Sequence, residues 1–97
     1  MSSRRKYLVC YDIADPKRLH KVAKICESYG TRVQLSVFEA SLDGMMLASF
    51  QAELQAIIHH EEDQIIFIDL GRDDHSTPFH IDTMGLPYIK RSRITII

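Results

Sequence analysis

Apolar and polar residues alternate along the chain in a pattern that predicts six short elements. The first apolar run lies within residues 6–13, is rich in strand formers, and stops at the turn residues 14–16. A short apolar run bounded by turn residues is typical of a buried central strand. Asp12 lies at the far end of this predicted strand, where a carboxylate is held rigidly yet reaches solvent.

The next stretch predicts a helix over about 16–29. Asp15 is a suitable N-cap, Pro16 fits the first helical position, and Gly30 is a typical terminator. Apolar residues recur at helical spacing and predict the buried stripe: Leu19, Val22, Ala23, Cys26 and Tyr29. Three lysines fall on another face, which is either an ordinary solvated face or a track for phosphates: Lys17, Lys21 and Lys24.

The middle of the chain predicts two strands, a helix and a further strand. Residues 31–40 alternate like a strand, and Ser36 marks a tight turn or bulge that divides them into two. A second helix starts at 43–44, and residues 64–70 predict another buried strand, closed by Gly71. The order strand, helix, strand, strand, helix, strand is that of an α+β, ferredoxin-like βαββαβ domain.

The end of the chain predicts one more strand and a partner subunit. Residues 93–97 are strongly strand-forming, whereas 77–87 give no clear pattern. A bare hydrophobic edge strand invites aggregation, so we expect this tail to pair with its own sheet or with that of a second subunit. The sequence therefore predicts one domain over 1–97 with an additional C-terminal strand, in a two-fold homodimer in which this strand crosses over and pairs with the second subunit.

Composition narrows the class of protein but not its activity. The 97 residues are 45% hydrophobic and 26% charged, as in ordinary soluble domains. No apolar run is long enough to cross a bilayer, and no signal-peptide core follows the basic start. We therefore expect no association with a membrane. Cys10 and Cys26 lie in apolar patterns, which predicts reduced core thiols and a cytoplasmic protein. The net charge of -1 gives no overall signal for nucleic acid, although basic residues cluster at 4–6 and 90–93.

Three segments together resemble a known family. They are YDI at 11–13, KR at 17–18 and YGTRVQLSVFE at 29–39, within a likeness that spans residues 7 to about 70. The chain resembles the small nucleases called CRISPR-associated protein two. The resemblance implies a ferredoxin-like homodimer and metal-dependent cleavage of single-stranded RNA or double-stranded DNA. It also implies a part in CRISPR adaptation and antiviral defence, in which the dimer bridges copies of the CRISPR integrase and holds spacer DNA.

The resemblance also implies roles for particular residues. Asp12 corresponds to the family's catalytic and metal-binding aspartate. Five further residues would line the dimer groove and contact substrate: Tyr11, Arg18, Arg32, Ser36 and Phe38. The chain departs from the family after Arg18, where further arginines are common and Leu19 and His20 stand here. This departure bears on the efficiency of catalysis more than on the fold.

The chemistry of these residue types is consistent with the metal-dependent nuclease activity that the resemblance implies. Two Asp12 carboxylates near a two-fold axis would repel each other unless one takes a proton or a divalent cation binds. Oxygen ligands favour Mg²⁺ or Mn²⁺ over zinc. Arg18 or Arg32 would hold a phosphate through paired hydrogen bonds. Phe38 is either a base-stacking ring or a core residue, and Ser36 either binds phosphate or forms the turn.

Competing functions remain open at this point. An endonuclease and a non-catalytic adaptor that holds DNA and the integrase both fit the resemblance, and a ribonuclease toxin of similar fold is a further alternative. An RNA-recognition module would need an aromatic-rich strand that residues 37–40 lack. The histidines do not have the spacing of a zinc site: His20, His59, His60, His75 and His80.

Overall fold

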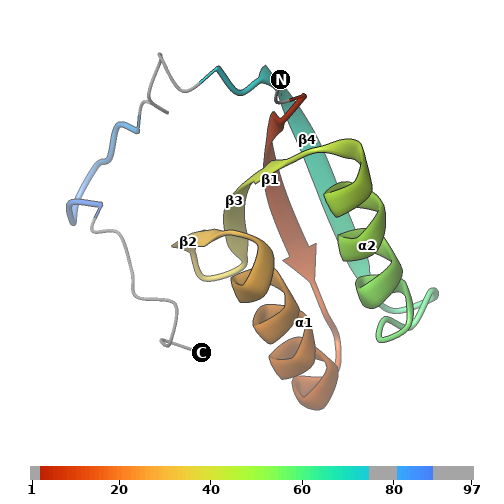
Figure 1. The fold of residues 1–97 in the computed structure, drawn as a ribbon. Helices are drawn as coiled ribbons and strands as arrows, with labels where there is room; N and C mark the ends of the chain where they lie inside the picture. Colours follow the sequence, from red (N-terminus) through yellow and green to blue (C-terminus); the bar gives the residue numbers. More distant parts are fainter. Residues whose placement is uncertain (1–2, 75–80, 89–97) are drawn as a thin grey trace.

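The six elements predicted over residues 6–71 are all present in the computed structural model, which describes residues 3–74 and 81–88 (Figure 1). Their bounds are β1 Arg5–Asp12, α1 Pro16–Tyr29, β2 Thr31–Gln34, β3 Val37–Leu42, α2 Gly44–Gln55 and β4 Gln64–Arg72. The predicted division of the 31–40 stretch is confirmed, because β2 and β3 are separate antiparallel strands on either side of residues 35–36.

The strands form one four-stranded sheet in the order β2-β3-β1-β4. Strand β1 is central, as predicted, and pairs antiparallel with both β3 and β4. Helices α1 and α2 lie side by side against the sheet, and residues 81–88 lie away from both (Figure 1). This is the ferredoxin-like α+β fold that the order of elements predicts.

Both helix starts follow from side-chain caps. Asp15 accepts hydrogen bonds from the backbone N–H groups of Lys17 and Arg18, each at 3.0 Å, and Asp43 accepts one from Met46 at 2.8 Å. Each cap satisfies donors that the first helical turn leaves without partners. Because Asp15 caps α1, Asp12 is not needed for that task.

The core lies between the helices and one face of the sheet. Every second residue of β1 points into it, namely Tyr7, Val9 and Tyr11, at 8%, 0% and 7% exposure. Three residues of the stripe predicted for α1 are buried, namely Val22, Ala23 and Cys26, whereas Leu19 and Tyr29 are partly buried. Helix α2 contributes Phe50 and Leu54. Burial raises the pKa of the Cys26 thiol to about 12, so this cysteine is an inert core residue.

Two predictions about buried residues are wrong, and both concern the face of the sheet that the helices do not cover. Strand β4 is not buried on both faces, because Ile66, Ile68 and Leu70 are 44%, 43% and 44% exposed. Cys10 is likewise only half-buried, since it pairs with Ile66 on that face. The physical reason is that α1 and α2 cover a single face of the sheet.

Gly71 also does not close β4. The strand continues to Arg72, and Gly71 lies within it at a φ of 105°, a left-handed conformation that favours glycine. The register with β1 shifts here, because Lys6 pairs with Gly71 whereas Tyr7 pairs with Asp69. Leu70 is skipped between these two pairs and is the extra residue of a bulge in β4, next to Gly71.

The expected strand over 93–97, the basic cluster at 90–93 and residues 77–80 lie outside the described residues, as do His75 and His80.

We expect Gly30→Ala to destabilise the protein, because Gly30 lies directly against the Glu39 carbonyl of β3 and a Cβ there would overlap it. The expected loss is roughly 1–3 kcal/mol, typical of overpacking. Gly44→Ala is the matched control, since nothing lies within 4 Å of the added Cβ. Urea unfolding of both variants checks this, and equal stabilities would contradict it.

Candidate functional site

Asp12 is the last residue of β1 and is exposed at the end of the central strand. Its backbone pairs with Gln64, the first residue of β4. Within residues 3–74 and 81–88 the Asp12 side chain makes no hydrogen bond or ion pair. The carboxylate is thus fixed by a rigid strand and is available to a ligand.

The β2–β3 turn is tied to the same end of β1. The Tyr11 N–H donates to the Ser36 carbonyl at 3.1 Å. The Leu35 carbonyl accepts from Nη1 of Arg32 at 2.5 Å and from the Tyr11 hydroxyl at 3.5 Å. These bonds hold residues 35–36 beside Asp12, so Ser36 has the turn role considered above and also lies near the predicted catalytic position.

Tyr11, Arg32 and Phe38 form a buried cluster beneath that turn. Arg32 is 3% exposed and Phe38 is 1% exposed. The Arg32 guanidinium carbon lies 4.8 Å from the centre of the Phe38 ring, and the Tyr11 ring stacks on the same ring at 6.2 Å. Burial raises the pKa of Tyr11. In this arrangement Phe38 has the core position that its residue type favours.

Arg32 forms an ion pair with Glu27, with Nη2 3.8 Å from Oε2. Its Nε and Nη2 atoms have no hydrogen-bond partner in the part of the chain that the structure describes. A buried guanidinium held this way supports the turn. The substrate role predicted for Arg32 remains a prediction.

Arg18 is also engaged within the protein. Its Nε donates to Oδ2 of Asp63 at 2.7 Å, its Nη2 donates to Oδ1 of Asp63 at 3.1 Å, and the same Nη2 donates to Glu62 at 3.1 Å. This paired geometry is the strong form of an arginine–carboxylate contact. The Asp63 hydrogen bond is the main reason that the pKa of Arg18 is raised.

The sequence alone did not single out Asp63. Besides Arg18, the Asp63 carboxylate accepts the backbone N–H of Ala14 at 2.9 Å and that of His59 at 2.8 Å, and its side chain is 0% exposed. The available signal was its position directly before β4, whose first residue pairs with Asp12. Asp63 thus joins the β1–α1 loop, α1 and the loop after α2.

We expect the stabilising effect of Asp63 to disappear in acid. The Arg18 side chain and the backbone donors hold the pKa of Asp63 well below its usual range. The contribution of Asp63 to the free energy of unfolding is therefore fully present above the pKa of an unfolded aspartate, about 3.9. It is lost as the pH falls toward the lower pKa that Asp63 has in the folded protein. The difference in urea midpoint between wild type and Asp63→Asn should shrink from about pH 5 to about pH 2. A difference that does not change with pH would contradict this assignment.

The described residues contain no group of three or more histidine, cysteine or acidic side chains that could hold a metal ion. Within the single chain, Asp12 therefore offers one exposed carboxylate. This donor fits Mg²⁺, which is commonly bound by one or two carboxylates and keeps several waters.

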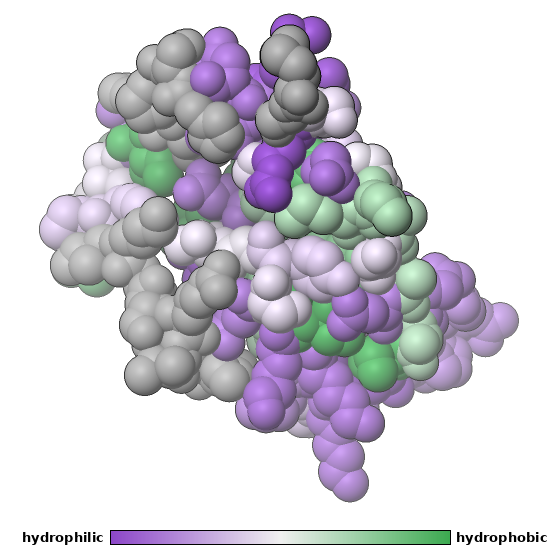
Figure 2. Space-filling model, viewed as in Figure 1, coloured by the Kyte–Doolittle hydropathy of each residue, from purple (hydrophilic) through white to green (hydrophobic). Residues whose placement is uncertain are grey.

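The face of α1 away from the core is basic. Lys17, Lys21 and Lys24 are all exposed, and hydrophilic residues gather at the end of the molecule where α1 begins (Figure 2). This face begins a short distance along the chain from Asp12. It is suited to contact a phosphate backbone without reading bases.

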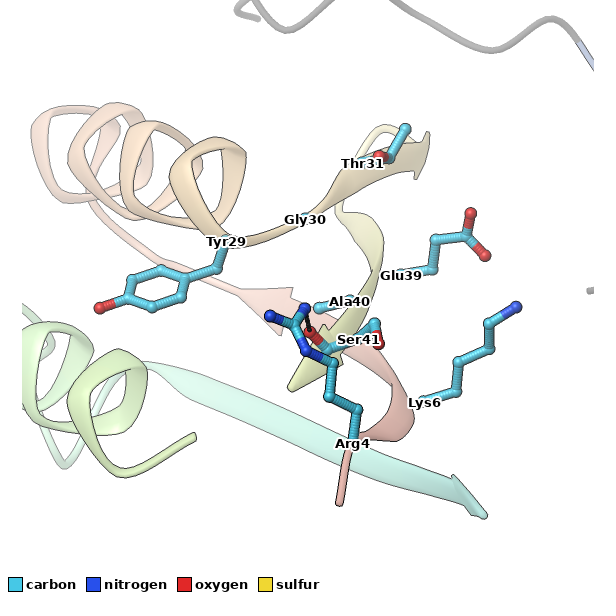
Figure 3. A pocket seen from close by; sticks show the side chains of 8 residues that line it. All are labelled: Arg4, Lys6, Tyr29, Gly30, Thr31, Glu39, Ala40 and Ser41. Atoms are coloured by element: carbon cyan, nitrogen blue, oxygen red, sulfur yellow. Dashed lines mark hydrogen bonds between the residues drawn. The ribbon is translucent and has the colours of Figure 1, made fainter. Parts of the chain in front are cut away.

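A pocket of about 230 Å³ lies elsewhere, at the start of β1 (Figure 3). Arg4, Lys6, Glu39 and Ser41 line it, and the Arg4 guanidinium donates to the Ser41 carbonyl at 3.3 Å. Asp12 occupies the opposite end of β1. The pocket is therefore separate from the candidate site.

The fold and the exposed carboxylate define a ferredoxin-like protein with an acidic site at the end of its central strand. Residues 5–77 match the family model described as CRISPR associated protein Cas2. The chain belongs to the Cas2 family, and this membership confirms the resemblance stated above.

Named relatives support the assignment. The chain is 46% identical over 65 residues to CRISPR-associated endoribonuclease Cas2 1 of Rhodospirillum rubrum, covering 67% of this chain and 64% of that protein. It is 40% identical over 79 residues to CRISPR-associated endonuclease Cas2 of Halalkalibacterium halodurans, covering 76% of this chain and 82% of that protein. It is 47% identical over 60 residues to a second Rhodospirillum rubrum protein, CRISPR-associated endoribonuclease Cas2 4, covering 62% of this chain. The chain spans about half of that relative, 48% of its length.

Solved structures agree with the fold. Streptococcus pyogenes Cas2 at pH 6.5 superposes with a TM-score of 0.69 at 38% identity, covering 82% of this chain and 99% of that one. A hypothetical protein from Thermus thermophilus superposes with a TM-score of 0.73 at 30% identity, covering 91% of this chain and 99% of that one. No helix within the described ranges is both long and apolar enough to cross a membrane.

Proposed function

We propose that this protein is a metal-dependent endonuclease that hydrolyses phosphodiester bonds in single-stranded RNA or double-stranded DNA. The observation that carries the proposal is the Asp12 carboxylate, exposed and without a side-chain partner among the described residues, at the end of the central strand. Membership of the Cas2 family and the names endoribonuclease and endonuclease among the relatives point the same way. The setting is CRISPR adaptation in the cytoplasm.

Asp12 would hold Mg²⁺, or Mn²⁺ in its place. A bound divalent cation supplies stabilisation of the charge that develops on the phosphate and lowers the pKa of its water. The chain's own contribution is to fix the carboxylate on a strand that is paired on both sides. The exposed lysines of α1 would attract the backbone, and Ser36 lies close enough to β1 to contact a phosphate there.

A homodimer would complete the site. The apolar stripe Ile66, Ile68 and Leu70 on the open face of the sheet is about half exposed in the single chain, and a second copy would cover it. Two-fold symmetry would also supply a second Asp12 carboxylate. Light scattering should give twice the mass of one chain, and the mass of a single chain would contradict the dimer.

A non-catalytic adaptor is the second candidate. Both arginines predicted to bind phosphate, Arg18 and Arg32, are engaged inside the protein, which leaves few groups at Asp12 to assist cleavage. In this case the dimer would hold spacer DNA and the CRISPR integrase through its surface, and Asp12 would have no chemical role.

Metal dependence separates the two candidates. Purified wild type is incubated with single-stranded RNA and with double-stranded DNA, in Mg²⁺, in Mn²⁺ and in chelator. The endonuclease proposal expects cleavage of at least one substrate with metal and none with chelator. Tight DNA binding without cleavage in any metal would favour the adaptor.

A further inference from the structure

The Arg18–Asp63 pair lies where it determines the path of the chain after Asp12. Between Asp12 and the helix that starts at Pro16 there are only three residues. The central one, Ala14, donates its N–H to Oδ1 of Asp63 at 2.9 Å, and Arg18 donates to both oxygens of the same carboxylate. Asp63 itself directly precedes Gln64, the residue that pairs with Asp12.

The Asp63 carboxylate is therefore held from several directions at once. It accepts from Ala14, from two nitrogens of Arg18 and from the His59 N–H, and its side chain is fully buried. Such a carboxylate has its acceptor sites filled and is not available to a metal. Its position makes it a support for a neighbouring ligand residue instead.

We infer that Arg18 and Asp63 act as one positioning unit that orients Asp12, and that Arg18 is not a phosphate ligand. The inference rests on the proposed function of Asp12 and adds how that carboxylate is held. Residues that hydrogen-bond directly to metal ligands change metal affinity or activity by about 10–100-fold when removed, and we expect the lower end of this range for a pair that acts on Asp12 through the backbone. A phosphate ligand would instead change the affinity for nucleic acid and its salt dependence.

A double-mutant cycle on the full chain tests the inference. The variants are Arg18→Gln, Asp63→Asn and the double variant. Arg5→Gln is the matched control, because it removes the exposed ion pair with Asp69 at the opposite end of β1. The readouts are kcat, KM for single-stranded RNA at several salt concentrations, and the Mn²⁺ dissociation constant by calorimetry.

We expect each single variant to lower kcat by about 10-fold and to weaken Mn²⁺ binding by a similar factor, with KM and its salt dependence unchanged. The double variant should be no worse than either single variant, because the two residues act together. Arg5→Gln should match wild type.

Three results would overturn the inference. A higher KM with reduced salt dependence in Arg18→Gln alone would make Arg18 a phosphate ligand. Losses that multiply in the double variant would show independent roles. A lower melting temperature with unchanged kcat and Mn²⁺ affinity would reduce the pair to a structural contact.

The failure of the proposed function has a different signature. If wild type binds Mn²⁺ but cuts nothing, the nuclease proposal fails, and the Mn²⁺ dissociation constants of the variants still decide whether the pair positions Asp12. If wild type neither cuts nor binds Mn²⁺, both the proposed function and the positioning inference are wrong.

Discussion

Asp12→Asn should abolish nucleic-acid cleavage, lowering the rate by about 10³-fold or more, while the protein stays folded. The asparagine removes the charge that would attract Mg²⁺ but keeps nearly the same shape. Because the Asp12 side chain is exposed and makes no hydrogen bond or ion pair within the described residues, we expect its replacement to leave the fold intact. The measurement is the cleavage of labelled RNA and DNA in Mg²⁺ and Mn²⁺.

Asp15→Asn is the control for this experiment. It removes a carboxylate three residues away, but asparagine caps a helix as well as aspartate does, so α1 is retained. We expect its cleavage rate to stay close to that of wild type. Equal cleavage by Asp12→Asn and wild type would show that Asp12 is not the catalyst and would point to a contaminating nuclease.

Phe38→Ala should destabilise the protein by roughly 3–5 kcal/mol, the usual result of removing a buried phenylalanine. Phe38 is 1% exposed and contacts both Tyr11 and the Arg32 guanidinium. Its loss would leave a cavity beneath the turn that adjoins Asp12. Urea or thermal unfolding of the purified variant measures the effect.

Phe38→Leu distinguishes a core residue from a base-stacking one. The leucine retains most of the apolar volume, so we expect a smaller loss of about 1–2 kcal/mol and unchanged affinity for RNA and DNA. Phe50→Leu is the matched control, since Phe50 is equally buried and stacks on Tyr29 at 4.4 Å. A large drop in nucleic-acid affinity for Phe38→Leu alone would restore the stacking role.

The local sequence was sufficient to predict the elements. Asp15 and Asp43 are caps that act within one helical turn, and the stripe through Val22 and Cys26 depends only on spacing along α1. The position of Asp12 at a strand end followed in the same way from the apolar run before it. Such features depend on near neighbours in the chain.

Partners that are distant in sequence could not be predicted. Arg18 meets Asp63 across 45 positions, and Arg32 turns inward to the Leu35 carbonyl and the Phe38 ring. An arginine gives the same sequence pattern whether it faces a phosphate or a carboxylate of its own chain. The exposed face of β4 was missed for a similar reason, because a short apolar run does not show which face the helices cover.

Mn²⁺ binding to wild type and to Asp12→Asn decides whether Asp12 is the metal ligand, and it is followed by calorimetry and by anomalous scattering from crystals soaked in Mn²⁺. We expect a Mn²⁺ ion at the Asp12 carboxylate in wild type and its loss in the variant. Unchanged Mn²⁺ binding in Asp12→Asn, or an ion bound only at other residues, would contradict it.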